Sequence, residues 1–290
     1  MKRLEDLAKR AVGPKRRRQI ALARVRIRSL TSDWRRLPDF LVIGAQRSGT
    51  SSLYKYLSAH PGVVPSVRKE VEYFSRYYSH GDRWFRAHFP LRARSCQTFE
   101  ATPDYLLHPL APARAKSDVP DARFVVILRE PVARAFSHYQ HEVRLGFERL
   151  SFERALELEQ ERIMPDLDRL QEDPLYPPRH LYFFSYVTRG LYAQQLARWF
   201  NQFPRERFLV IFSENFFADT ARTYEQILRF LGLPEHRLRT FANYSSRSSA
   251  DLSSIDDRTR RRLVDTFEPA NRDLENLLGV PTPWTIRAPT

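Results

Sequence analysis

The 290-residue sequence predicts an α/β fold in which helices flank a central parallel β-sheet. Three uninterrupted apolar runs, rich in β-branched and aromatic residues, have the length of strands buried on both faces. These runs span 40–43, 124–128 and 208–212. The segments that follow them show helical periodicity, at 51–60, 131–145 and 219–231. Strand–helix alternation of this kind is typical of a parallel sheet with helices on both faces.

Apolar periodicity predicts further helices at 151–163, 190–201 and 257–278. Proline and aromatic residues crowd 165–186, which therefore has the composition of a long surface loop. The chain shows no internal repeat and no low-complexity tract.

Composition excludes several classes of protein. The single cysteine, Cys96, rules out an internal disulfide framework and any multi-cysteine metal or Fe–S site. No run approaches the ~18 consecutive apolar residues of a membrane span, and the N-terminus lacks the apolar core of a secretory signal. We therefore expect a soluble, cytoplasmic protein.

The positive charge is concentrated at the N-terminus. Residues 1–36 hold 13 of the Lys and Arg residues and 3 of the Asp and Glu residues, whereas 37–290 hold 35 and 31. We interpret 1–36 as a basic, mostly helical extension and 37–290 as the globular domain, whose nearly balanced charge argues against nucleic-acid binding. The extension has two interpretations: a solvated leader, or a segment in peripheral contact with an anionic membrane at its inner face.

The first motif is a glycine loop between a predicted strand and a predicted helix. Residues 40–53 read FLVIGAQRSGTSSL, with Gly44 and Gly49 spaced as in a P-loop. Such a loop directs backbone N–H groups and a helix N-terminus at an anion. A nucleotide-triphosphatase loop requires Gly-Lys-[Ser/Thr], but here Thr50 follows Gly49 directly and the cation is Arg47. An ordinary tight turn is the alternative.

The second motif follows the run 124–128. A Mg²⁺-dependent P-loop enzyme places an aspartate at this strand end, but the residue here is Arg129. Pro131 then suits the first position of a helix, which carries Arg134 and Ser137. Arg129 and Ser137 together could hold a second phosphate. The alternative for Arg129 is an ion pair with Glu130 or another acid.

Together these motifs resemble those of sulfotransferases. Residues 44–53 resemble the family's 5′-phosphosulfate loop, and residues 123–139, RFVVILREPVARAFSHY, resemble its 3′-phosphate motif. The likeness covers most of 38–280 and is greatest to the heparan sulfate glucosaminyl 3-O-sulfotransferases and their bacterial relatives. It implies a P-loop-like sulfotransferase fold, 3′-phosphoadenosine 5′-phosphosulfate (PAPS) as co-substrate, and a hydroxyl acceptor on a carbohydrate or glycolipid.

The resemblance also implies roles for single residues. Binding of the phosphosulfate falls to the loop residues Arg47, Ser48, Gly49, Thr50, Ser51 and Ser52. Arg129 and Ser137 would hold the 3′-phosphate. Tyr192, with Arg189, is expected to face the cleft. Arg247 stands where the family has a cofactor-binding Lys-Gly-Arg loop, although the Lys-Gly is absent here and a flexible Ser-rich turn is the alternative.

A Glu between the motifs matches the family's proposed catalytic base. Residues 70–74 read EVEYF where the 3-O-sulfotransferases have Glu-Val-His-Phe-Phe, which places the base at Glu70 and puts Glu72 in the position of the His. The alternative is an exposed Glu paired with Lys69 or Arg68. The family's Glu-Lys-Thr-Pro segment has Ala101 in place of Lys, which weakens the case for an anionic glycan acceptor.

The predicted reaction is an in-line sulfuryl transfer, with Glu70 as general base and Arg47 stabilising the developing charge. The histidines show no metal-binding spacing, so no metal is expected. Two alternatives stay open: an atypical P-loop kinase or hydrolase, which would require Mg²⁺ and ATP, and a non-catalytic nucleotide-binding protein.

Overall fold

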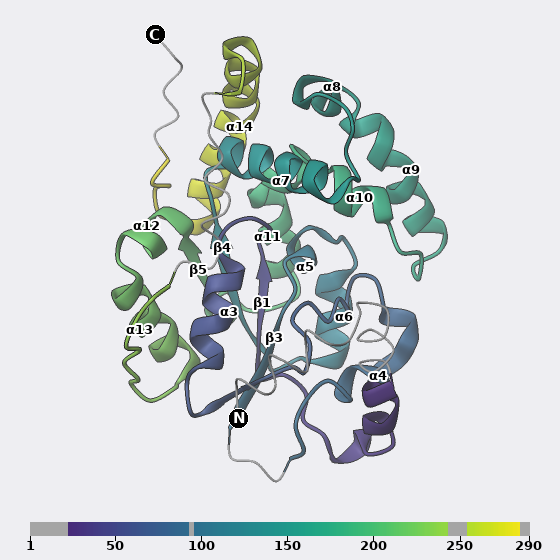
Figure 1. Ribbon diagram of the computed structural model, residues 1–290, viewed down its shortest axis with the longest axis vertical. Helices are drawn as coiled ribbons and strands as arrows, with labels where there is room; N and C mark the ends of the chain where they lie inside the picture. Colours follow the sequence, from purple (N-terminus) through teal and green to yellow (C-terminus); the bar gives the residue numbers. More distant parts are fainter. Residues whose placement is uncertain (1–22, 93–95, 243–253, 285–290) are drawn as a thin grey trace.

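A computed structural model describes residues 23–92, 96–242 and 254–284, and these form one parallel five-stranded sheet with helices on both faces (Figure 1). The strand order across the sheet is β2-β3-β1-β4-β5. The strands are β1 (Phe40–Gly44), β2 (Val63–Pro65), β3 (Gln97–Ala101), β4 (Arg123–Leu128) and β5 (Phe208–Phe212).

The three strands that the apolar runs predict are β1, β4 and β5, and they are neighbours in the sheet. Their register pairs Val42 with Val125 and Val125 with Leu209. The sequence did not reveal β2 and β3, because β2 has only three residues and β3 alternates apolar with polar side chains. Glu100 of β3 is fully buried nonetheless, and its Oε2 accepts hydrogen bonds from Thr102 Oγ1 and the Val71 N–H.

Successive side chains of each central strand point to opposite faces of the sheet, because the strand is pleated. One face packs on α3 (Thr50–Ser58), α12 (Ser213–Ala218) and α13 (Thr220–Leu231). The other packs on α4 (Gly81–Arg86), α5 (Asp104–Leu107), α6 (Ala111–Asp118), α11 (Tyr192–Phe200) and α14 (Asp257–Leu278). Phe40 and Val42 point to the first face, Leu41 and Ile43 to the second, and all four are completely buried.

The predicted helices are present near their predicted bounds except the one at 151–163, which the structure divides into two helices at 152–157 and 159–172. α7 (Pro131–Leu145) and α14 have the predicted bounds, and Glu130 caps α7 by accepting hydrogen bonds from the N–H groups of Val132 and Ala133. Short 3₁₀ segments complete the described secondary structure at Ser32–Trp34, Tyr78–His80, Thr188–Gly190 and Arg205–Arg207.

The prediction of a surface loop at 165–186 is wrong. After α8 (Phe152–Glu157), α9 (Glu159–Glu172) continues through Pro165, and α10 (Arg179–Phe184) follows. Ile163 and Leu170 of α9 are buried, with Ile163 packing against Leu181 of α10. The Asp166 carboxylate accepts hydrogen bonds from the backbone N–H groups of His180 and Leu181 at 2.6 and 3.1 Å. This packing outweighs the hydrogen bond that a mid-helix proline removes.

Part of the predicted N-terminal extension packs on the domain. Residues 23–29 are helical. Arg28 donates to the carbonyl oxygens of Ala87 and Phe89, and Arg35 Nη1 also donates to Phe89 O at 2.9 Å. Residues 1–22 lie outside the described residues. Among the helices that are described, none is long and apolar enough to cross a membrane.

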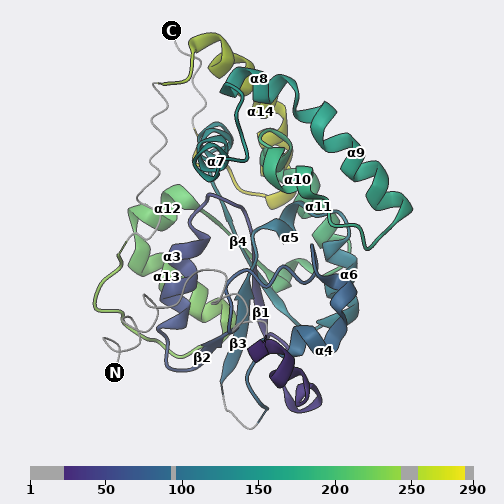
Figure 2. The ribbon, with the colours of Figure 1, turned by 45° about the vertical axis from the view of Figure 1, so that its right-hand side comes forward.

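The carboxyl ends of the parallel strands meet at one edge of the sheet. Helices α7 to α10 gather beyond this edge (Figure 2). The loop that follows β1, the start of α7 and the segment that follows β3 therefore approach one another, which is where open α/β sheets form their binding sites.

Candidate active site

A cavity of about 780 Å³ opens at the carboxyl edge of the sheet. We call one wall the loop side; it consists of residues 46–51 together with Arg129, Ser213, Glu214 and Phe217. We call the remaining part of the lining the carboxylate side; its charged residues are Glu70, Glu72, Arg76, Asp104 and Glu142, beside Tyr182.

Two glycines give the loop its shape. A Cβ atom on Gly44 would lie 2.7 Å from Leu106 Cβ, so only glycine fits between β1 and α5. Gly49 has φ 109° and is the N-terminal residue that precedes α3. The N–H groups in the first turn of a helix lack intrahelical partners, and they carry the positive end of the helix dipole. The loop therefore presents an anion-binding helix N-terminus to the cavity.

The structure brings the two sequence motifs into direct contact. Arg47 Nε donates to Ser137 Oγ at 3.1 Å, and Arg129 Nη1 donates to the carbonyl oxygen of Arg47, also at 3.1 Å. Tyr192 supports Arg129 from behind, because its hydroxyl donates to the Arg129 carbonyl at 2.8 Å. Cations from the loop after β1 and the end of β4 thus share one wall.

The positive charges of the loop side favour the binding of an anion. Burial lowers the pKa of Arg47 to about 10, and the positive charges of Arg144 and Arg129 act in the same direction, against the opposing effect of Glu142. Clustered, desolvated cations repel one another, so a bound polyanion would stabilise their charged forms. Ser48 Oγ is buried and has no hydrogen-bond partner among the described residues, which leaves a hydroxyl in the loop to contact such a ligand.

On the carboxylate side, the chain from Glu70 to Tyr73 is held by four successive backbone N–H groups. They donate in order to Ala101 O at 3.2 Å, Glu100 Oε2 at 3.4 Å, Thr102 Oγ1 at 3.1 Å and Tyr105 Oη at 2.8 Å. This segment is not a strand, because Glu70 and Glu72 both have left-handed backbone angles, φ 61° and 60°. Such angles are unfavourable for non-glycine residues, and they concentrate at functional sites.

The two glutamates have different surroundings. Glu72 has a side chain only 11% exposed, and its carboxylate pairs with Arg68 at 3.0 Å and Arg76 at 3.3 Å. Burial raises the pKa of Glu72, partly offset by Arg76. The Glu70 side chain is 47% exposed, lines the cavity and contacts Lys69 Nζ. Glu72 is thus locked into an ion-pair network, whereas Glu70 is accessible from the cavity.

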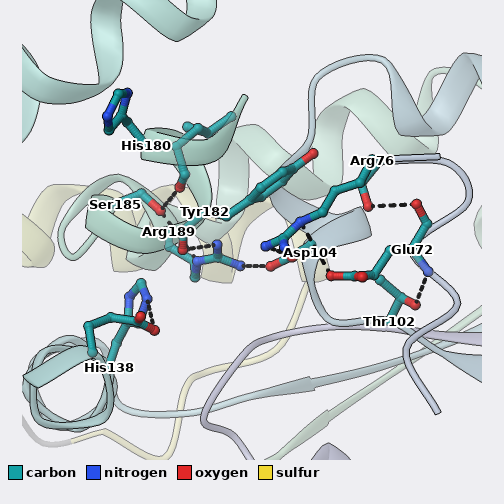
Figure 3. Close-up of polar contacts among 12 residues, drawn as sticks. Glu72, Arg76, Thr102, Asp104, His138, His180, Tyr182, Ser185 and Arg189 are labelled. Carbon is teal, nitrogen blue, oxygen red and sulfur yellow. Dashed lines mark hydrogen bonds and ion pairs between the residues drawn. The ribbon is translucent and has the colours of Figure 1, made fainter. Parts of the chain in front are cut away.

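Arg76 connects the carboxylates of this wall (Figure 3). Its Nη2 lies 3.5 Å from Asp104 Oδ2, and its guanidinium carbon lies 4.2 Å from the centre of the Tyr182 ring. Asp104 is held from the other side by the fully buried Arg189, whose Nη1 donates to Asp104 Oδ1 at 2.8 Å.

Glu142 of α7 completes the carboxylate side. It is 2% exposed, and its Oε1 lies 3.4 Å from His138 Nε2. Its Oε2 has no hydrogen-bond partner among the described residues. Burial raises the pKa of Glu142 to about 7, with Arg189 opposing and Asp104 reinforcing the shift. Burial also holds the pKa of His138 well below its ordinary value, which favours the neutral ring.

Comparison with known proteins identifies the family. Residues 37–262 match the profile of the sulfotransferase domain. The chain belongs to the sulfotransferase family. One relative is the bifunctional heparan sulfate N-deacetylase/N-sulfotransferase 3 of Homo sapiens, 33% identical over 69% of this chain and 23% of that protein. Another is the heparan sulfate glucosamine 3-O-sulfotransferase 6 of Homo sapiens, 31% identical over 69% of this chain and 53% of that protein. This sulfotransferase thus matches only part of the length of these curated relatives.

Solved structures show the same fold. A sulfotransferase from Alicyclobacillus acidocaldarius superposes with a TM-score of 0.69 and 29% identity, over 85% of this chain and 98% of that one. The mouse sulfotransferase SULT7A1, solved in complex with PAP, superposes with a TM-score of 0.51 at 14% identity, over 84% and 89% of the two chains. The predicted P-loop-like sulfotransferase fold is confirmed.

The predicted site residues of the sulfotransferase fall into three groups. Residues 47–51, Arg129 and Glu70 line the cavity. Ser52, Ser137 and Tyr192 are buried behind the loop side and do not line it. Arg247 lies outside the described residues.

Two expectations about neighbouring residues are corrected. Arg189 and Tyr192 do not face the cleft, because each is 1% exposed; they act on it through Asp104 and the Arg129 carbonyl. The alternative ion pair between Arg129 and Glu130 is not formed in the described part of the chain, where the Glu130 carboxylate caps α7.

Sequence reasoning missed Arg76, Tyr182 and Glu142 as site residues. Glu142 and Arg76 lie just beyond the segments 123–139 and 70–74 that resemble the family's motifs, and Tyr182 lies on α10, in a stretch whose composition predicts a loop. The one local signal was the spacing of Glu72 and Arg76, four residues apart. Within the described residues, no group of three or more His, Cys, Asp or Glu side chains could hold a metal ion.

Proposed function

We propose that this sulfotransferase uses PAPS to sulfate a hydroxyl group, on a carbohydrate or glycoconjugate, by in-line displacement. The observation that supports the proposal most is that a basic phosphate loop and an accessible carboxylate, Glu70, line the same cavity. The curated relatives named above, described as heparan sulfate sulfotransferases, favour a carbohydrate acceptor.

The loop side has the donors that a nucleotide carrying phosphate and sulfate groups requires. The helix N-terminus, the buried Ser48 hydroxyl and the Arg47 guanidinium would hold the phosphosulfate, and Arg129 would hold the 3′-phosphate. Ser137 and Tyr192 would position Arg47 and Arg129. When bound, PAPS supplies the sulfuryl group, whose bond to the 5′-phosphate breaks as its bond to the acceptor oxygen forms.

Glu70 would act on the acceptor. A neutral hydroxyl is a poor nucleophile, so a base that removes its proton in the transition state accelerates attack. Glu70 is accessible from the cavity, and the four hydrogen bonds to its backbone segment fix its position. Arg47, on the loop side, would stabilise negative charge that develops on the leaving phosphate.

A transfer assay tests the proposal. Labelled PAPS is incubated with the full chain and a panel of sugar, glycolipid and small-molecule hydroxyl acceptors, and labelled product is expected from at least one. Phosphorylation from ATP that depends on Mg²⁺, with no transfer from PAPS, would contradict the proposal and favour a kinase. Binding of PAP without turnover on any acceptor would favour a non-catalytic protein.

We further propose that the N-terminal segment contacts an anionic membrane surface. Ile27, Leu30 and Trp34 are the three most exposed large apolar side chains of the described residues, at 69%, 83% and 69%. The exposed Arg24 and Arg26 accompany them, and residues 1–22 add eight Lys and Arg against two Asp and Glu. Apolar side chains among cations are typical of interfacial segments. The cytoplasmic location stays a prediction.

Deleting residues 1–22 tests this contact while keeping the anchors Arg28 and Arg35. We expect binding to vesicles containing phosphatidylserine at low salt to fall by at least about tenfold, since each cation near such a surface contributes ~1 kcal/mol. Trp34→Ala should weaken binding less, and activity on a soluble acceptor should persist in both variants. If the full chain does not bind these vesicles, the N-terminal segment is a solvated leader and the proposed membrane contact is wrong.

A further inference from the structure

The charges that line the cavity restrict which acceptors can bind there. This inference rests on the proposed function. The carboxylate side has four carboxylates, Glu70, Glu72, Asp104 and Glu142, and one arginine, Arg76. Wherever the acceptor reaches Glu70, it also approaches this wall.

Arg76 is already committed to two of these carboxylates. It lies 3.3 Å from Glu72 Oε1 and 3.5 Å from Asp104 Oδ2, and it stacks on the Tyr182 ring. Burial lowers the pKa of Arg76, but the opposing effect of nearby groups, led by these two carboxylates, leaves this pKa above its ordinary value. An anionic group on the acceptor would have to compete with both carboxylates for this cation.

The cations next to this wall are engaged in the same way. Arg68 pairs with Glu72 at 3.0 Å, and Lys69 contacts Glu70. Arg189 is buried behind Asp104, so it neutralises Asp104 and cannot itself reach an acceptor. Among the described residues that line the carboxylate side, Arg76 is the one Lys or Arg.

Glu142 gives this wall an acceptor for hydrogen bonds that the protein itself does not use. It is almost completely buried, it lines the cavity, and its Oε2 has no hydrogen-bond partner among the described residues. A hydroxyl or ammonium group of the acceptor would donate a hydrogen bond to this oxygen, which would then have a partner. When Glu142 is ionised, a carboxylate or sulfate group there would add a second desolvated negative charge.

We infer that the acceptor is a hydroxyl compound without anionic groups near the reacting hydroxyl, and that Glu142 helps to select it. This conclusion differs from what the polyanionic substrates named for the heparan sulfate enzymes would suggest. It is specific to the carboxylate side; the loop side keeps its affinity for anionic phosphates.

Acceptors that differ by one group provide the test. The 4-nitrophenyl β-glucoside and β-glucuronide share a ring and an aglycone but carry CH₂OH or carboxylate, and the β-glucosaminide carries an ammonium. With saturating PAPS, we expect kcat/KM for the glucoside to exceed that for the glucuronide by at least about tenfold. The glucosaminide should react at least as well as the glucoside. A glucuronide that reacts equally well or better overturns the inference.

Salt dependence and a matched variant strengthen the test. Raising salt from about 50 to about 300 mM should increase kcat/KM for the glucuronide, because salt screens repulsion, and leave the glucoside nearly unchanged. Glu142→Gln should reduce the glucoside preference several-fold, whereas Glu172→Gln, an exposed carboxylate at the end of α9, should not. A glucuronide rate that falls with salt, as attraction would produce, contradicts the inference.

Binding separates this inference from the proposed function. Titration calorimetry with the PAP-loaded protein should give a tighter Kd for the glucoside than for the glucuronide, whether or not turnover is detected. The opposite order overturns the inference and leaves sulfuryl transfer intact. Failure of the protein to bind PAP overturns the proposed function, and the inference with it.

Discussion

The two walls of the cavity differ in how the chain builds them. The loop side comes from three places, residues 46–51, Arg129 and the start of α12, each of which follows the end of a strand closely. The carboxylate side comes from four separate places: the segment at 70–76, the residues from Thr102 to the start of α5, α7 and α10. Cations and helix N–H groups dominate the first wall, and carboxylates dominate the second.

This difference separates tasks that need different chemistry. Phosphate groups are the same in every reaction cycle, so a short loop at a helix N-terminus can hold them by backbone geometry. An acceptor is recognised by side chains, and side chains from several elements can change independently. Variants of the two walls should accordingly separate binding of the nucleotide from turnover.

The largest effect is expected on the carboxylate side. Glu70→Gln keeps the shape of the side chain and removes its basicity, so turnover should fall by about 10²–10⁴-fold. PAP affinity should change by less than about threefold, because Glu70 lies on the carboxylate side and not in the phosphate loop. Steady-state transfer kinetics and PAP titration measure the two quantities.

Glu72→Gln is the control for Glu70. It breaks ion pairs to Arg68 and Arg76 rather than removing a base, so it should impair acceptor binding more than the chemical step. If Glu72→Gln is inactive and Glu70→Gln is active, Glu72 is the base. If both variants keep full turnover, neither carboxylate serves as the base.

The next effect tests the loop side. Arg129→Ala should lower PAP affinity by about 1.5–3 kcal/mol, the scale of a charge-assisted hydrogen bond. Arg123→Ala is a matched control, because Arg123 lies at the opposite end of the same strand and donates to Phe230 O. Unchanged PAP affinity in Arg129→Ala would mean that the 3′-phosphate is held elsewhere.

PAP should stabilise the folded protein without a metal. A ligand at 100 times its Kd stabilises the native state by about 2.7 kcal/mol, which corresponds to a rise in Tm of about 5 °C for a domain of this size. EDTA should leave this rise unchanged, because cations of the loop side supply the affinity. Absence of any shift with millimolar PAP would exclude PAPS as the co-substrate.

The smallest effect concerns pH and Glu142. Its pKa of about 7 lies above the ordinary 4.5, so its contribution to stability is complete below the ordinary value and is lost as pH rises through 7. As pH rises from 5 to 8, the free energy of unfolding of Glu142→Gln should therefore increase by about 1–2 kcal/mol relative to that of the wild type, a figure that allows for solvent screening at the cavity. Urea unfolding at both pH values measures this gain, and a difference independent of pH would show that Glu142 is not buried in its charged form.

Local sequence was sufficient for the central sheet and the loop side. β1, β4 and β5 contain uninterrupted apolar runs because helices pack on both faces of the sheet, although Leu209 and Val210 of the edge strand β5 are only partly buried. The helices after these strands have strong periodicity. The phosphate loop is a contiguous motif, so its glycines and Arg47 can be recognised along the chain. Even so, the contact of Arg47 with Ser137, 90 residues away, required the pairing of β1 with β4.

Tertiary packing decided what the sequence left open. Pro165 and the aromatic residues around it indicated a loop, but burial of Ile163 and Leu181 against each other stabilises two helices there. Arg76, Tyr182 and Glu142 come from the segment after β2, from α10 and from α7, and they meet at one cavity only in the folded chain. A side chain's charge and periodicity are properties of the local sequence, whereas its burial and its partners depend on residues far away in the chain, and these set which carboxylates of this cavity are paired and which are accessible.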